Sequence, residues 1–166
     1  MKEFPATLKY VTVWLVLGTV VFLGYRWYEV QQQRERISFL KDSSGAGALH
    51  IKRAGNGHYY LPLQINGQEV MFMVDTGATR SAISRQMAQQ LGIEEELRQT
   101  FNTANGIVQG ALGKATLVIP HELGMRFENL RIAILPNLSG EPLLGMDVLG
   151  QLRVTQNAGV LKLQPH

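Results

Sequence analysis

The triplet Asp75-Thr76-Gly77 directly follows an apolar run at residues 70–74 (VMFMV). This order predicts a β-strand that delivers an acidic side chain into a tight loop. Gly77 lets backbone N–H groups approach the carboxylate oxygens closely, and the Thr76 hydroxyl can brace the loop. An ordinary turn after a strand is the alternative, because Asp, Thr and Gly are all common turn residues. The triplet makes Asp75 a candidate catalytic acid without establishing catalysis.

A second motif follows much later, where residues 142–149 (PLLGMDVL) join an apolar pair and a glycine to a short amphipathic stretch. This segment and residues 75–79 (DTGAT), in this order, resemble the retroviral-type (retropepsin-like) aspartic proteases. The resemblance covers residues 49–163 and is strongest to the single-lobe, membrane-anchored bacterial members. It implies a mostly β fold, a closed retropepsin-like barrel lobe with one or two short helices.

In the resembled family the triplet carries the catalytic acid, and the apolar-apolar-Gly segment packs beneath it. The resemblance therefore gives Asp75 the catalytic role and gives Thr76, Gly77 and Ala78 the support of the active-site loop. It implies an aspartic endopeptidase that hydrolyses peptide or protein substrates and requires neither a metal nor an organic cofactor.

This chemistry uses two carboxylates, but the 166 residues contain the triplet once. Two carboxylates within hydrogen-bonding reach share one proton, so the pair can activate water and protonate a leaving group. One Asp75 per chain therefore implies a homodimer in which a twofold axis brings the two acids together. A monomer without activity until a partner brings a second lobe is the alternative.

Asp147 is the other acid that could complete a pair within one chain. We expect it to be solvated in the first turn of a short helix at residues 145–152, where the helix dipole favours an acid. The resembled family has no catalytic residue at this place. The same helix is predicted to turn Met146, Leu149 and Leu152 inward.

A hairpin is predicted around Asn105-Gly106, between strands at residues 97–104 and 107–111, because Asn-Gly favours tight two-residue turns. It stands where the resembled family has its flap, so Asn105, Gly106, Ile107 and Val108 are candidates to cover the substrate. An ordinary surface hairpin explains the pattern equally well. Candidates to line the substrate pockets are the apolar residues Ile83, Ile107, Val108 and Leu144.

The other elements follow from periodicity and turn residues. Asn66-Gly67 predicts a hairpin between strands at 57–65 and 68–74. A helix is predicted from Ser81 to Leu91, with Gly92 at its C-terminal end. Further strands are predicted at 114–119, 130–135 and 153–163, the last broken by a turn at residues 157–159.

The N-terminal region predicts a membrane anchor at residues 1–28. No charged residue lies between Tyr10 and Tyr25, and Trp27 and Tyr28 have the amphipathic rings typical of a membrane interface. A buried core helix and a cleaved signal peptide are the alternatives, although no small-x-small cleavage site follows the apolar run. Residues 29–48 are predicted to form a polar stalk, and residues 49–166 the protease domain.

Charge and composition exclude several classes of function. The net charge of +3 is spread along the chain, so we expect no nucleic-acid partner. The absence of cysteine excludes disulfides and thiol catalysis, and the four histidines stand apart, so no metal site is predicted.

Two expectations concern location and activity. The positive charges flanking the apolar run do not decide the orientation, but the resemblance favours a single-pass protein of the inner membrane with its catalytic domain in the periplasm. The rival to an enzyme is a non-catalytic peptide-binding module of the same fold, in which Asp75 is only a turn residue.

Overall fold

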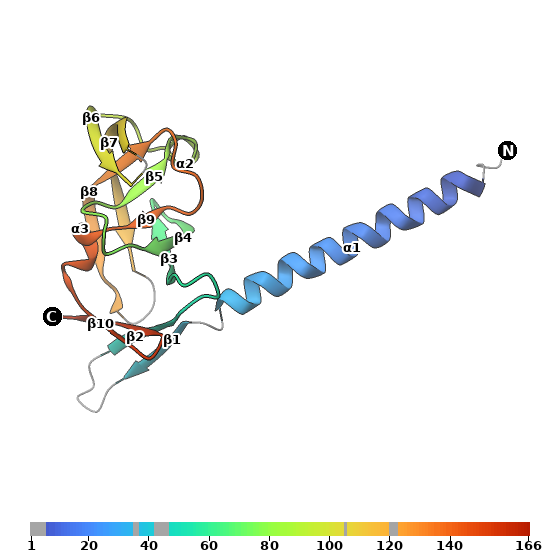
Figure 1. Cartoon of the computed structure of the whole chain (residues 1–166), viewed down its shortest axis with the longest axis horizontal. Coiled ribbons are helices and arrows are strands. Elements are labelled where there is room, and N and C mark those ends of the chain that lie inside the picture. The colour runs from blue at the N-terminus through green and yellow to red at the C-terminus, as the bar shows by residue number, and fades with distance from the viewer. Residues whose placement is uncertain (1–5, 35–36, 42–46, 105, 120–122) are drawn as a thin grey trace. The chain divides into compact units, whose positions relative to one another are not determined.

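The computed structural model describes residues 6–34, 37–41, 47–104, 106–119 and 123–166. The chain divides into two compact units, Met1–Arg36 and Ile37–His166. The first unit contains the helix α1 (Ala6–Arg34), and the second contains all the strands and two short helices (Figure 1).

Helix α1 contains the predicted membrane segment. Its stretch Tyr10–Tyr28 is long and apolar enough to cross a membrane, and its side chains are exposed, including Trp14 and Trp27. Exposed apolar surface of this extent is costly in water, which is why length and composition make this helix a membrane-span candidate.

The second unit is mostly β, as predicted. Its elements, in chain order, are β1 (Ile37–Lys41), β2 (Gly47–Lys52), β3 (Tyr60–Ile65), β4 (Gln68–Val74), β5 (Ala82–Ser84), α2 (Arg85–Gln90), β6 (Leu97–Thr103), β7 (Gly106–Val118), β8 (Arg126–Leu135), β9 (Leu143–Leu144), α3 (Met146–Leu149), β10 (Leu152–Asn157) and β11 (Val160–Pro165).

A closed barrel forms the centre of this unit. The larger sheet has the order β3-β4-β9-β5-β8-β7-β6, and β3 also pairs with β7. The six strands from β3 to β7 in this order therefore close into a barrel. Among the described strands, β6 pairs only with β7 and is the outer strand of a hairpin. The predicted closed lobe with short helices is confirmed.

The barrel encloses the main hydrophobic core. Apolar side chains from β3, β4, β7, β8 and β9 point inward, and Val148 and Leu149 of α3 close the packing at 0% exposure. Removing such surface from water is the main stabilising term of the fold. The largest fully buried members are Phe72, Leu49, Ile51, Leu61, Leu63, Ile65, Ile83, Leu117, Ile119, Ile132, Ile134 and Leu144.

A second sheet of four strands has the order β1-β2-β11-β10, all antiparallel (Figure 1). Strand β1 and the first residues of β2 belong to the segment predicted as a stalk at residues 29–48. Helix α1 also enters that segment and ends at Arg34. Residues Ile37–Lys41 of this segment are therefore not a linker, because their backbone pairs with β2.

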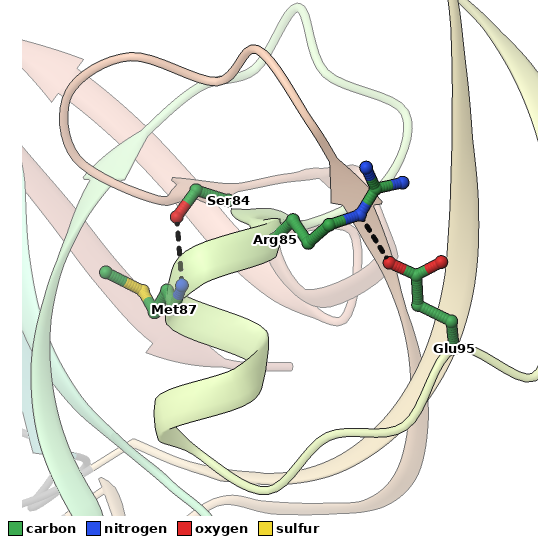
Figure 2. Close-up of polar contacts among 4 residues, drawn as sticks. All are labelled: Ser84, Arg85, Met87 and Glu95. Atoms are coloured by element: carbon green, nitrogen blue, oxygen red, sulfur yellow. Dashed lines mark hydrogen bonds and ion pairs between the residues drawn. The ribbon is translucent and has the colours of Figure 1, made fainter.

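The helix predicted from Ser81 to Leu91 is wrong in its first half. Residues Ala82–Ser84 form strand β5, which pairs with β8 and β9, and α2 covers only Arg85–Gln90. Tertiary strand pairing overrides the helical spacing here. The Ser84 hydroxyl then accepts a hydrogen bond from the Met87 N–H at 3.1 Å, which caps α2 (Figure 2).

The end of α2 follows the prediction. Gly92 has a φ of +65°, the left-handed conformation that glycine adopts without strain after a helix. Arg85 also forms an ion pair with Glu95 at 2.6 Å between Nε and Oε1 (Figure 2). Because both side chains are more than a third exposed, this pair adds little to stability.

The first predicted hairpin is confirmed. Asn66 and Gly67 have φ angles of 49° and 82°, and their turn joins β3 to β4. In the second predicted hairpin, however, Thr103 pairs directly with Gly106, so Gly106 belongs to β7 and not to the turn. Asn105, the other residue of the predicted turn, lies outside the described residues.

The later elements also depart in detail. A single strand, β7, covers the predicted strand at 107–111 and the predicted strand at 114–119 as far as Val118, because it pairs with β6 along one part and β8 along the other. Helix α3 is one turn long, and Met146 is 42% exposed, so its predicted inward orientation is wrong. Val148 is buried in its place, whereas Leu149 and Leu152 are buried as predicted.

Candidate active site

Asp75 comes directly after β4 and is held there by backbone pairing. Strand β4 runs parallel to β9, with Met73 opposite Leu143 and Val74 opposite Leu144. The Asp75 N–H continues this ladder and donates to the Leu144 carbonyl at 3.0 Å. The apolar pair of the second motif therefore fixes the residue that begins the first motif.

The loop after Asp75 closes on its own carboxylate. The Gly77 N–H donates to Asp75 Oδ1 at 2.9 Å, and the Ala78 N–H donates to the Asp75 carbonyl at 3.2 Å. Asp75 is half-buried, whereas Thr76 and Gly77 are exposed. One carboxylate oxygen is thus oriented by the backbone, and the acid stands at an accessible surface of the domain.

Gly145 lies directly beneath this loop. A Cβ on Gly145 would come within 2.5 Å of the Arg80 carbonyl carbon and 2.7 Å of the Ser81 nitrogen, so only glycine fits. The next residue, Met146, donates its N–H to the Ala78 carbonyl at 2.8 Å. The packing of the apolar-apolar-Gly segment under the loop is the arrangement that the resemblance implies.

The environment of Asp147 differs from the expectation that this side chain is solvated in the first turn of a helix. Its two carboxylate oxygens accept from the Ser81 N–H at 2.9 and 3.0 Å, and its Oδ1 accepts from the Ser81 hydroxyl at 2.8 Å. Asp147 is therefore not merely solvated at a helix end, because it joins α3 to the loop that follows Asp75.

Ser81 is a site residue that the sequence analysis missed. Its side chain is fully buried, and its hydroxyl also accepts from the Gly145 N–H at 3.1 Å. The sequence placed it at the start of a helix that does not form there. A single serine carries no pattern of its own, so only the contact across 66 positions with Asp147 reveals its role.

The flap candidates lie on the β6–β7 hairpin. Ile107 is 76% exposed, Gly106 is exposed and Val108, opposite Phe101, is half-buried. Two predicted pocket-lining residues, Ile83 and Leu144, are wrong, because both are 0% exposed in the main core and cannot line an open pocket.

A second, smaller apolar cluster joins residues of β5, β8 and β9 with Phe101 of β6. Its buried members are Ala82, Ala133 and Leu135, and the half-buried residues packed on them are Phe101, Leu138 and Leu143. Because Leu143 is paired with Met73, two residues before Asp75, this cluster provides apolar surface close to the candidate acid.

These features can be compared with known proteins. The model of the family described as "gag-polyprotein putative aspartyl protease" matches residues 61–151, which include both motifs. The chain belongs to this family. The aspartyl protease assignment agrees with the order of β4, the loop and β9 around Asp75.

Relatives support the assignment along most of the chain. An uncharacterised protein of Rickettsia prowazekii (strain Madrid E) is 32% identical over 162 residues, covering 92% of this chain and 68% of the relative. An uncharacterised protein of a Sinorhizobium species is 26% identical over 168 residues, covering 93% of this chain and 71% of the relative.

Among solved structures, a retropepsin-like aspartic protease from Rickettsia conorii is similar in fold and sequence. It matches with a TM-score of 0.62 and 30% identity, over 78% of this chain and 95% of that chain. The domain of this aspartyl protease family member therefore has the retropepsin-like fold.

Proposed function

We propose that this protein is a membrane-anchored aspartic endopeptidase that acts as a homodimer, with one Asp75 from each chain forming the catalytic pair. The observation that carries the proposal is the Asp75 carboxylate, oriented by the Gly77 N–H at 2.9 Å and left accessible on the domain surface. Thr76, Gly77 and Ala78 support the loop that holds it.

The environment of Asp147 favours a pair made by two chains. The Asp147 carboxylate accepts three hydrogen bonds from Ser81, so it is already bound within its own chain. The second carboxylate of the pair then comes from another copy of Asp75. Exposed Thr76 stands beside it and is the residue that would brace one loop against the other across the twofold axis.

The reaction proposed for this pair is hydrolysis of a peptide bond by water. The ionised Asp75 takes a proton from water as the water oxygen attacks the peptide carbonyl carbon, and the protonated Asp75 of the other chain donates to the developing oxyanion. The tetrahedral intermediate collapses when a proton passes to the amide nitrogen and the C–N bond breaks.

Substrate covering is assigned to the hairpin that carries Asn105, Gly106, Ile107 and Val108. The exposed apolar side chain of Ile107 supports this role, because it gains by packing on a substrate that binds below it. The substrates are peptides or proteins, and the apolar cluster of Phe101, Leu138 and Leu143 offers surface for their side chains.

The proposed anchor is the apolar stretch Tyr10–Tyr28 of α1. In this proposal the protein crosses the inner membrane once, and its protease domain lies in the periplasm. The exposed rings of Trp27 and Tyr28 support an interfacial position for the end of the stretch.

The deciding experiment is cleavage of a peptide library by the full chain in detergent, with wild type beside Asp75→Asn. Glu69→Gln, an exposed acid on the same strand, is the matched control. We expect cleavage that is lost in Asp75→Asn, kept in Glu69→Gln and blocked by a transition-state-mimicking inhibitor of aspartic proteases. A dimeric wild type that binds peptides without cleaving any would contradict the enzyme and favour the binding module.

A further inference from the structure

The four-stranded sheet has two chemically different faces. Leu49, Ile51, Leu161 and Leu163 point from β2 and β11 into the main core. Because neighbouring residues of a strand alternate between faces, His50, Lys52 and Lys162 point the other way, and Lys162 lies opposite both His50 and Thr155. Arg153 of β10 has the same orientation as Thr155.

We call this second side the outer face, and define it by the residues His50, Lys52, Arg153, Thr155, Asn157 and Lys162. Lys52, Arg153, Thr155 and Asn157 are exposed, and His50 and Lys162 are half-buried. Ala48, at the start of β2, is buried, so the open part of the face lies over the end of β2, β11 and β10.

The charge of the outer face has one sign. Strands β2, β10 and β11 contain Lys52, Arg153 and Lys162 and no acidic residue. The ion pairs among the described residues use Arg85, Lys114 and Arg126 instead, so none of the three cations of the outer face forms an ion pair with a described residue. Such a surface favours an anionic partner.

Chain connectivity indicates which anionic partner is available. Helix α1 ends at Arg34 and β1 begins at Ile37, three residue steps that span about 11 Å at most. The helical residues after Tyr28 add about 9 Å. The lipid headgroup layer takes up about 5–8 Å of the combined length of these two segments, so the domain is tied close to the membrane surface.

We propose that the outer face docks on the anionic headgroup surface of the membrane that α1 crosses. The short connection from α1 ties the domain to the membrane only if α1 is the proposed anchor. The charge of the outer face does not depend on that proposal. Screening leaves electrostatic attraction effective over about 8 Å at physiological salt, a distance within reach of a domain tied this closely. Basic residues beside a membrane helix are attracted to anionic lipids in the same way. Contact with a second copy is disfavoured, because it would place like charges together.

The experiment uses the full chain in vesicles and a fluorescent label at Thr155→Cys. The natural chain has no cysteine, so the label is unique. Quenching by a nitroxide attached to lipid headgroups reports how close the outer face lies to the bilayer. The vesicles contain phosphatidylcholine alone or phosphatidylcholine with phosphatidylglycerol. A label at Gln99→Cys, exposed on β6, is the matched position away from the face.

Charge variants test the cause of the quenching. The first is the triple variant Lys52→Gln, Arg153→Gln and Lys162→Gln. The control is Lys114→Gln, Arg126→Gln and Arg131→Gln on β7 and β8, which changes the net charge equally. We expect quenching at position 155 in the anionic vesicles that falls at least about twofold in neutral vesicles, in high salt and in the first triple variant, but not in the control.

The docking would be overturned by equal quenching at positions 155 and 99. It would also be overturned by quenching at position 155 that is the same in neutral and anionic vesicles. Self-quenching at position 155 in lipid-free detergent that rises with protein concentration and exceeds self-quenching at position 99 would overturn it in favour of contact between copies through this face. Flotation in high salt tests the anchor separately. A chain that still floats without charge-dependent quenching contradicts the docking alone, and a chain released by salt contradicts the anchor while supporting the docking.

Discussion

Asp147 accepts three hydrogen bonds from Ser81, at 2.8 Å from the hydroxyl and at 2.9 and 3.0 Å from the backbone N–H. Ser81 follows the active-site loop and Asp147 lies in α3, so this contact joins the two motifs of the family. The Ser81 hydroxyl also accepts from the Gly145 N–H. The pair therefore fixes the position of Gly145 beneath the loop that carries Asp75.

Replacing Asp147 tests the energy of this contact. We expect Asp147→Ala to lower the free energy of unfolding by about 2–4 kcal/mol, because it leaves the buried Ser81 donors without an acceptor. Asp147→Asn keeps one acceptor oxygen and should lose less. Urea unfolding measures both, with exposed Glu141→Ala as the control expected within about 0.5 kcal/mol of wild type. An Asp147→Ala protein as stable as the control would refute the structural role.

Gly145→Ala tests the close approach of β9 to the loop. The new Cβ would meet the backbone of Arg80 and Ser81, which cannot rotate away as a side chain can. We expect destabilisation by about 1–3 kcal/mol or more, as for overpacking elsewhere, together with loss of peptide cleavage. Gly55→Ala is the matched control, because an added Cβ there has nothing within 4 Å. Thermal unfolding that shifts equally in both variants would contradict the prediction.

Ile107→Ala tests whether the β6–β7 hairpin covers the substrate, without a large effect on stability. The side chain is 76% exposed, so its loss should change the free energy of unfolding by less than about 0.5 kcal/mol. If Ile107 packs on bound substrate, the KM for a cleaved peptide should rise severalfold. The control is Leu97→Ala, which is 58% exposed at the end of β6 farther from Ile107. Steady-state kinetics that are unchanged in Ile107→Ala would show that this hairpin is not a flap.

Mixing the wild type with Asp75→Asn tests the shared catalytic pair. When equal amounts are unfolded together and refolded, random pairing gives about a quarter wild-type dimers. Activity per total chain should therefore fall to about a quarter of that of the undiluted wild type, because a mixed dimer has one carboxylate instead of two. A fall to only one half would indicate that each chain acts alone. Glu69→Gln, mixed in the same ratio, should leave the activity unchanged.

Local chemistry was sufficient for several features of the fold. The apolar run before Asp75 predicted β4, and Asn66-Gly67 predicted the turn before it, because both depend on neighbouring residues. The two motifs also predicted the retropepsin-like barrel through their resemblance to a family. The helix predicted from Ser81 failed for the opposite reason. Residues Ala82–Ser84 gain more from pairing with β8 and β9 than from the helix that their spacing allows.

The sequence by itself determined the acid of the candidate site, the loop that holds it and the apolar stretch of α1, since each depends on consecutive residues of the chain. Only the tertiary structure decided what supports that loop. The contact of Ser81 with Asp147, the fit of Gly145 under Arg80 and the single sign of charge on the outer face join residues far apart in the chain. Such contacts exist only after strands pair and the core packs, so no local pattern records them.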